Sequence, residues 1–295
     1  MKRAGVLLLT GCIVITVLFT SCATSFVKRV PPRPVSLMGE EGNIVITVDA
    51  LKERELVSLV FDGIDELGAR SRRISLELKG QDDRYPLDLS SLSMWALLEG
   101  DYPSFLVNTA LMYVPSLTRH EVEDGPTWFS QKEGPISLRA LGKDAILLTD
   151  GDYETAYRRY KGGEVLLDEE TTRLLESASI GIYALRPKTF FDLGLDLPQS
   201  VFEQSETVVL LLEKRDDGSY GVDAIITMQS EKGASTLSQM VRSGYIAQLR
   251  KEGKAVNIAA LREMFLIEGD RVMIKAMDLP PDQLTELKRS LVGII

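Results

Sequence analysis

The sequence is poor in the residues that build most catalytic and metal sites. Its 295 residues include one histidine, His120, and two cysteines, Cys12 and Cys22. A Ser/His/Asp or Cys/His catalytic set is therefore excluded except around His120, and a metal site with several histidine ligands is excluded altogether. The sequence also lacks a Walker-type phosphate loop, a Gly-x-Ser-x-Gly nucleophile elbow and a dinucleotide-binding glycine motif. These absences favour a protein without catalytic residues, metal or cofactor.

Both cysteines lie within the first 22 residues, so the rest of the chain has no thiol pair to oxidise and depends on an apolar core. About 270 residues follow Cys22, enough for one large domain or two small ones. Without Lys2 and Arg3, the chain keeps 32 basic and 43 acidic residues, a net charge of about −11. Such a surface repels nucleic acid, so we expect no nucleic-acid partner.

The N-terminus has the pattern of an export signal. Lys2 and Arg3 precede an uncharged segment, residues 4–27, that is rich in leucine, valine and isoleucine. The segment Leu18-Phe19-Thr20-Ser21-Cys22 resembles the lipobox of bacterial lipoproteins, with Phe19 where Leu, Val or Ile is usual. The resemblance implies a signal peptide over residues 1–21 and a lipid on Cys22. It implies location in the cell envelope, facing the periplasm or the exterior. It carries no information about activity.

Two alternatives to processing at Cys22 remain open. Leu9-Thr10-Gly11-Cys12 matches the short motif more closely, but cleavage there leaves too short an apolar stretch. An uncleaved transmembrane anchor is the second alternative, because the uncharged segment is just long enough to cross a hydrocarbon core of about 30 Å. Residues 22–42 follow as a tether, in which Pro31, Pro32 and Pro34 favour an extended spacer and neighbouring basic residues can touch anionic headgroups.

From residue 43 onward the same order of elements occurs twice. We expect a first half over residues 43–160, a connecting segment over 161–179 and a second half over 180–295. Each half follows the order β-α-β-β-α-β-β-α, and an acidic turn recurs at the same place. The sequence therefore predicts an α+β fold of two tandem, duplicated halves with mainly antiparallel sheets.

The expected elements are defined by apolar periodicity and turn residues. In the first half they are strand 44–48, a helix with Leu56, Leu59, Val60, Ile64 and Leu67 on one face, strand 74–78, the acidic turn 82–88 leading into a strand, one kinked or two short helices within 93–114, strands 136–141 and 145–149, and helix 153–160. In the second half they are strands 180–185 and 208–212, the acidic turn 216–223, a helix from N-cap Ser235 to Gly253, strands 264–267 and 271–277, and helix 281–291.

Three polar or aromatic clusters are candidates for chemistry. His120 with Glu121, Glu123 and Asp124 has groups for a divalent cation or acid–base catalysis, but the following Gly125-Pro126 turn favours an exposed loop. The second cluster consists of the aspartates of the two acidic turns: Asp82, Asp83, Asp88, Asp216, Asp217 and Asp223. They can hold calcium or act at a glycosidic bond only if they converge in space, and aspartates at such positions more commonly shape the turn. The helical spacing of Tyr153, Tyr157 and Tyr160 favours core packing over ligand stacking.

The main candidate for ligand binding is the apolar segment 189–200. Its candidate side chains are Phe190, Phe191, Leu193 and Leu195, interleaved with aspartate, glycine and proline. Such a loop can form the lip of a hydrophobic pocket or a docking patch, or fold as a lid onto its own core. We therefore predict a lipid-anchored, non-enzymatic binding or envelope-associated module with its site between the halves. Its partner is an envelope protein or an apolar ligand. The alternatives are a carrier of apolar ligands and an envelope hydrolase or metal-dependent enzyme around His120.

Overall fold

The computed structural model of the chain describes residues 33–60, 65–80, 92–122, 125–187 and 199–294. The expected signal peptide, Cys22 and the first part of the tether lie outside these residues. The chain from Pro32 to Ile295 forms one compact unit, so the two halves share a single domain. Within the described ranges, no helix is both long and apolar enough to cross a membrane.

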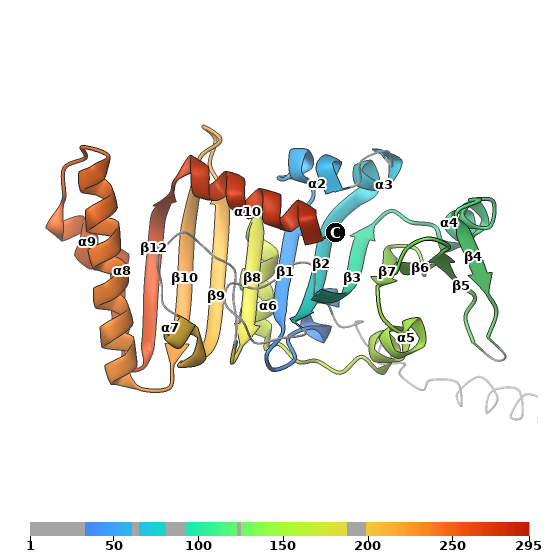
Figure 1. Ribbon diagram of the computed structural model, residues 1–295, viewed down its shortest axis with the longest axis horizontal. Helices are drawn as coiled ribbons and strands as arrows, with labels where there is room; N and C mark the ends of the chain where they lie inside the picture. Colours follow the sequence, from blue (N-terminus) through green and yellow to red (C-terminus); the bar gives the residue numbers. More distant parts are fainter. Residues whose placement is uncertain (1–32, 61–64, 81–91, 123–124, 188–198, 295) are drawn as a thin grey trace, which may run out of the picture. The chain divides into compact units, whose positions relative to one another are not determined.

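The described strands form one continuous sheet of twelve strands (Figure 1). Every neighbouring pair is antiparallel, so the predicted α+β class with mainly antiparallel strands is confirmed. The order is β11-β12-β10-β9-β8-β1-β2-β3-β7-β6-β5-β4. The strands are β1 Ile44–Asp49, β2 Ser71–Gly80, β3 Leu92–Gly100, β4 Leu117–His120, β5 Trp128–Gln131, β6 Ser137–Leu141, β7 Ala145–Thr149, β8 Ile180–Leu185, β9 Ser205–Lys214, β10 Tyr220–Met228, β11 Phe265–Glu268 and β12 Arg271–Leu279.

The two halves meet at the centre of the sheet, where β1 pairs with β8 and Ile46 lies opposite Ile182. Outward from this centre, β1-β2-β3-β7-β6 and β8-β9-β10-β12-β11 follow the same order of elements. Strands β4 and β5 lie beyond β6 and have no equivalent beyond β11 among the described residues. The repeated order agrees with the predicted tandem halves, whereas their origin by duplication stays a prediction.

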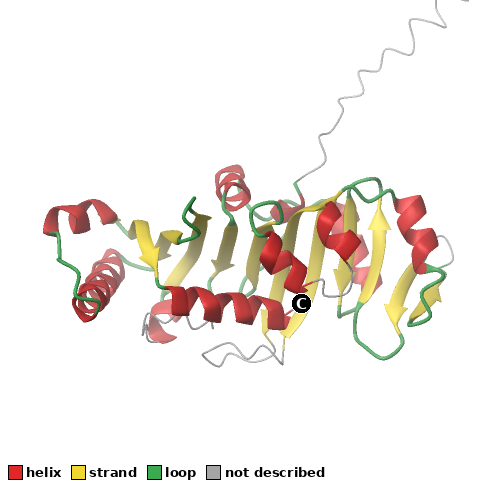
Figure 2. Cartoon of the chain, turned by 90° about the horizontal axis from the view of Figure 1, so that it is seen from above, coloured by secondary structure: helices red, strands yellow, loops and turns green. Residues whose placement is uncertain are grey.

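Helices lie on both faces of the sheet, and α10 runs along one of them (Figure 2). Their bounds are η1 Pro34–Leu37, α2 Arg54–Val60, α3 Asp65–Arg70, α4 Ser104–Leu111, α5 Tyr153–Gly162, α6 Glu169–Ser177, α7 Gln199–Glu203, α8 Glu231–Lys251, α9 Ile258–Met264 and α10 Pro281–Ile294. Asp152 and Asp168 cap α5 and α6 by accepting hydrogen bonds from backbone N–H groups, as their sequence positions before each helix favour.

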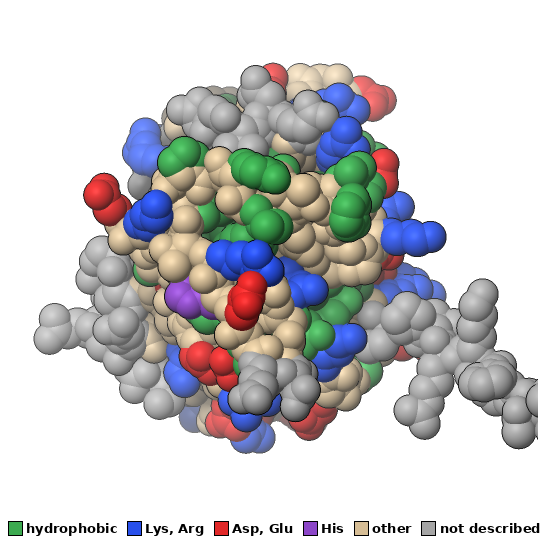
Figure 3. All heavy atoms as spheres, turned by 90° about the vertical axis from the view of Figure 1, so that its right-hand side faces the viewer, with side chains coloured by type: hydrophobic (Ala, Val, Ile, Leu, Met, Phe, Trp, Pro, Cys, Tyr) green, Lys and Arg blue, Asp and Glu red, His purple; other side chains and the backbone are tan. Residues whose placement is uncertain are grey.

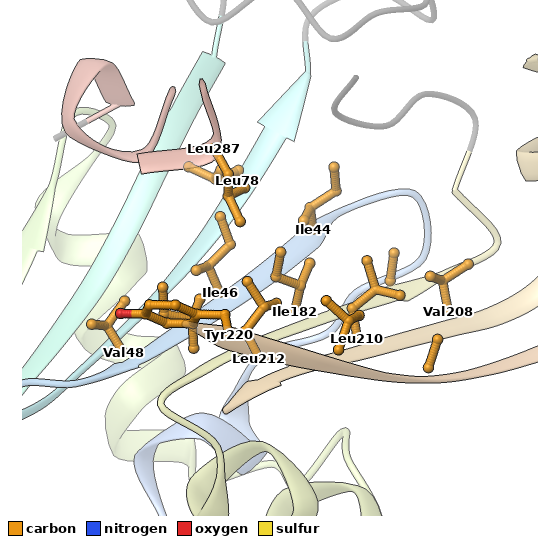
Figure 4. Packing of buried hydrophobic residues seen from close by; sticks show 14 of the residues in the cluster. Ile44, Ile46, Val48, Leu78, Ile182, Val208, Leu210, Leu212, Tyr220 and Leu287 are labelled. Atoms are coloured by element: carbon orange, nitrogen blue, oxygen red, sulfur yellow. The ribbon is translucent and has the colours of Figure 1, made fainter. Parts of the chain in front are cut away.

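Alternation along the strands divides the core between the two sheet faces. Ile44, Ile46 and Val48 of β1 point into the larger cluster, which α2, α7, α8 and α10 cover (Figure 4). Val45 points to the other face, where η1, α5 and α6 cover a smaller cluster. Because β1 is buried on both faces, it reads as a continuous apolar run rather than an alternating one.

The expected helices within residues 93–114 are wrong over the first part of that range. Residues 92–100 form β3, which lies between β2 and β7 and is buried on both faces at its centre. The run Met94 to Leu98 has no strict alternation and was therefore compatible with a helix. Gly100 is the last residue of the strand, and a Cβ there would clash with the carbonyl oxygen of Arg70, so a glycine is needed at this position. Pro103 is the N-cap of the short helix α4.

Other boundaries also differ from expectation. Helix α8 is capped by Ser230, whose side chain accepts a hydrogen bond from the N–H of Gly233, and not by Ser235. Gly253 follows the helix with φ of +70°, as its position predicts. Leu59 is 60% exposed, so it does not lie on the buried face of its helix. The expected tether is packed where the structure describes it: Val35 and Met38 are fully buried against the sheet.

Candidate ligand pocket

An apolar pocket lies between the sheet and helices α7, α8 and α10. Its free volume is about 60 Å³. The lining side chains come from the second half: Ile182, Phe202, Val208, Leu210, Leu212, Val222, Ala224, Ile226, Val241, Ile274, Met277, Leu279, Gln283 and Leu287. Thirteen of these fourteen are apolar, so the pocket suits an apolar ligand.

Helix α10 forms the cover of this pocket. It begins directly after β12 and crosses the sheet toward α2, with Gln283 and Leu287 facing the pocket. Leu287 is 8% exposed, and Leu284 packs against the same cluster while remaining partly exposed. Figure 4 shows Leu287 opposite the row of strand residues that runs from Tyr220 to Val208. Leu284 and Leu287 are therefore the apolar side chains of α10 that the structure describes in contact with this cluster.

A buried polar cluster fixes α10 next to the pocket. Glu53, which directly precedes α2, is fully buried, and its Oε1 accepts a hydrogen bond from the hydroxyl of Tyr220. The Nζ of Lys288 on α10 lies 3.7 Å from the Oε2 of Glu53 and 5.0 Å from the centroid of the Tyr220 ring. Lys288 is thus the charged partner that α10 offers to this carboxylate.

Because Glu53 and Tyr220 are buried, separating Glu53 from Tyr220 and Lys288 is energetically unfavourable. Burial, and then the hydrogen bond to Glu53, raises the pKa of Tyr220, so the phenol stays protonated and donates to the carboxylate. The Oε2 of Glu53 accepts no hydrogen bond in the structure, which leaves Lys288 as its compensation. Removing one partner of a buried ion pair leaves an uncompensated charge and is strongly destabilising.

A second buried carboxylate, Glu77, lies on the opposite sheet face and holds the N-terminal segment. Its Oε1 accepts hydrogen bonds from the N–H groups of Gly39 and Glu40, at 3.2 and 2.9 Å, and from Asn43 Nδ2 at 3.0 Å. Its Oε2 accepts from the indole N–H of Trp95 at 2.6 Å and pairs with Arg159 at 2.7 Å.

Arg159 of α5 completes this network. Its guanidinium lies over the ring of Trp95, 4.6 Å from the centroid, and also contacts Glu40 and the carbonyl oxygen of Leu37. An open pocket of about 290 Å³ borders the network. Both oxygens of Glu77 already have partners within the chain, so the network is built to hold residues 37–43 on the sheet rather than to bind a ligand.

The four residues expected to bind a ligand, Phe190, Phe191, Leu193 and Leu195, lie outside the described residues. The segment that follows them forms α7, and its Phe202 lines the pocket. Sequence reasoning missed Phe202 and Leu287. The signal for Leu287 was the apolar stripe that it forms with Leu284 on the last helix. We had expected the site between the halves. The described pocket lies within the second half instead.

His120 is the last residue of β4, where its ring stacks on Trp128 at 3.9 Å between centroids. Its Nε2 lies 2.8 Å from the hydroxyl of Ser130. Glu121 pairs with Arg119 at 2.7 Å, while Glu123 and Asp124 lie outside the described residues. In the part of the chain that is described, no three His, Cys, Asp or Glu side chains gather as potential metal ligands.

The other candidates have structural positions. Tyr153 is buried, and Tyr157 and Tyr160 pack against the same cluster, which is the packing role that their spacing favoured. Asp217 shapes the β9–β10 turn by accepting hydrogen bonds from the N–H and hydroxyl of Ser219, which lower the pKa of its carboxyl. The first acidic turn, residues 82–88, lies outside the described residues.

Comparison with known proteins identifies the fold alone. No family model and no curated protein matches the sequence. Three solved crystal forms of TP0453 are similar in structure. Crystal form I has a TM-score of 0.61 and 12% identity, covering 89% of this chain and 98% of that one. Form IV has a TM-score of 0.56 and 11% identity, covering 87% and 96%. Form III has a TM-score of 0.55 and 11% identity, covering 88% and 98%.

Proposed function

We propose that the chain is a lipid-anchored extracytoplasmic protein that binds an apolar ligand beneath α10, without catalysing a reaction on it. The observation that carries the proposal is the apolar pocket between α10 and strands β8, β9, β10 and β12. Apolar pockets of this kind favour ligands that bury hydrocarbon, such as an acyl chain. The anchor is inferred from residues 1–22 of the sequence.

The size of the pocket bears on how a ligand enters. A free volume of about 60 Å³ is far below the several hundred Å³ of typical ligand pockets. Binding therefore requires α10 to move away from the sheet. Among the described contacts of this helix are the packing of Leu284 and Leu287 on the core and the Lys288–Glu53 pair, and its displacement must break them.

Mass spectrometry of the full chain purified from its membrane tests both parts of the proposal. We expect a diacylglyceryl group on Cys22 and an apolar species that is released into organic solvent. A bare, uncleaved N-terminus contradicts the anchor. A protein that carries no apolar species and does not bind a fluorescent long-chain fatty acid contradicts the ligand.

The pocket itself is tested by filling it. Ala224→Phe adds a ring to the pocket wall, whereas Ile225→Phe enlarges a side chain on the opposite face of the same strand and serves as the control. We expect Ala224→Phe to weaken fatty-acid binding by about tenfold or more and Ile225→Phe to leave it unchanged. Equal affinity in both variants places the ligand elsewhere. Thermal unfolding of both variants checks that they fold.

A further inference from the structure

An exposed apolar surface lies at the β4 end of the sheet, on α4 and the residues that follow it (Figure 3). Five exposed large apolar side chains lie within ten positions of the chain: Phe105, Leu106, Met112, Tyr113 and Val114. Phe105 is 79% and Tyr113 is 80% exposed. Because contiguous apolar patches on soluble domains commonly mark contact sites, this end of the molecule is a candidate interaction surface.

Helix α4 is held in place by polar contacts that leave this surface open. None of its residues is fully buried. The side-chain amide of Asn108 donates to the carbonyl oxygen of Ala140 on β6 and accepts from the N–H of the same residue, both at 3.0 Å. These bonds satisfy the backbone of β6 beyond the point where β5 stops pairing with it. The helix is thus fixed to the sheet while Phe105 and Leu106 face outward.

Strand β4 beside this surface is an edge strand. It pairs with β5 through residues 117–120 and is the last strand in the order of the sheet. The outer side of such a strand presents backbone N–H and C=O groups that an added strand can pair with. The opposite edge strand, β11, is different because α8 and α9 pack against it.

A groove of about 370 Å³ lies between α4 and strands β4, β5 and β6. Phe105 and Met112 line its helical side, and Arg119, Phe129 and Arg139 line its strand side. Two guanidinium groups and, among the described residues, no carboxylate line the groove, although the chain as a whole has a net charge of −9. Arg119 pairs with Glu121, an exposed contact that is worth little in water and is easily exchanged.

We propose that this groove and the edge of β4 together bind an extended segment of a partner protein that carries acidic and apolar side chains. The edge supplies backbone hydrogen bonds, the arginines attract carboxylates, and Phe105 and Met112 contact the apolar side chains. A second copy of this chain fits less well. Both copies carry the same net charge of −9, so they repel each other. A flat lipid surface contacts the exposed apolar side chains but does not fill the groove.

Fluorescence anisotropy with the full chain and two labelled peptides tests the proposal. One peptide alternates valine with glutamate and the other alternates valine with lysine. We expect saturable binding of the glutamate peptide only. Arg119→Glu reverses a charge in the groove and is expected to weaken that binding by about tenfold. Lys232→Glu, on the exposed start of α8 at the other end of the sheet, is the matched control and is expected to change nothing.

A second variant tests the contribution of the edge itself. The bond from the N–H of Lys132 to the carbonyl oxygen of Ser116 sets a register in which the N–H of Thr118 faces β5 and that of Arg119 faces outward. Arg119→Pro removes this outward N–H and is expected to weaken binding more than Arg119→Ala, which keeps it. Amide hydrogen exchange of Arg119 is expected to slow when peptide is added to the unsubstituted chain. The proposal is overturned if the glutamate peptide does not bind. It is also overturned if that peptide binds the Arg119→Glu variant and the unsubstituted chain with equal affinity. Binding to phosphatidylglycerol vesicles that Phe105→Ser abolishes, without peptide binding, assigns the surface to lipid and overturns it too.

Discussion

Replacing Glu99 with glutamine is expected to stabilise the protein at neutral and higher pH. Glu99 lies on β3 between Arg73 of β2 and Ala145 of β7, and its Oε2 is buried without a hydrogen-bond partner. Burial, and then the nearby carboxylate of Glu176, raises the pKa of Glu99 to about 7, although Arg73 and Arg72 oppose the shift. The folded protein therefore holds this proton more tightly than the unfolded chain does.

The sign and size of the effect follow from that difference. Below the usual pKa of 4.5, Glu99 is protonated in both states and costs nothing. As the pH rises, the unfolded chain ionises first, so the folded state loses stability until the pH passes about 7. The pKa of Glu99 is raised from 4.5 to about 7, and each pH unit between these values corresponds to about 1.36 kcal/mol. Ionised Glu99 therefore lowers the free energy of unfolding by about 3 kcal/mol. Glutamine has nearly the same shape and carries no charge at any pH.

Urea unfolding at about pH 4 and about pH 8 measures this difference. We expect Glu99→Gln to match the unsubstituted protein at the lower pH and to exceed its free energy of unfolding by up to about 3 kcal/mol at the higher pH. Glu263→Gln, at an exposed position on α9, is the control and is expected to show no comparable gain. A Glu99→Gln variant that is less stable at pH 8, or that differs equally at both pH values, refutes the reasoning.

Three further predictions concern the buried networks and strand β3, whose residues from 93 onward were expected to be helical. Glu77→Ala should cost about 3–5 kcal/mol in urea unfolding, because it leaves Arg159 without its buried partner, and a loss below 1 kcal/mol contradicts the network. Gly100→Ala should destabilise by more than about 2 kcal/mol because of the backbone contact at its Cβ, whereas Gly244→Ala, in open space on α8, should stabilise by about 0.5–1 kcal/mol. Lys288→Met removes the charged partner of Glu53 from α10, so the helix should separate from the sheet more often. Amide exchange in α10 and the release of bound fatty acid should both become about tenfold faster, and unchanged rates argue against α10 as the cover.

Local patterns predicted much of the fold. The apolar runs at 44–48 and 180–185 indicated strands, and both form strands with those starts because short apolar runs of that length fit a sheet buried on both faces. Gly253 indicated the end of α8, since a glycine readily adopts the positive φ of +70° that it has just after the helix. Residues 92–100 could not be assigned in the same way, because nonalternating apolar residues fit a buried strand and a buried helix equally well.

The candidate site was less accessible to sequence reasoning. An apolar loop at 189–200 pointed to the second half, and the described pocket does lie there, but its walls are strand residues that read only as core. Nothing local separates a side chain that lines a pocket from one that fills a core, because the difference depends on where α10 lies over the sheet.

The sequence by itself determined the α+β class, the twofold order of elements and most helix and strand positions, because these depend on periodicity and capping between near neighbours. Only the tertiary structure decided that β1 pairs with β8 to join the halves, and that Glu53 and Glu77 are buried. A glutamate is normally exposed, and these two are buried because Tyr220 and Arg159 reach them from distant parts of the chain. Partners so far apart in sequence leave no local pattern, and folding alone brings them together.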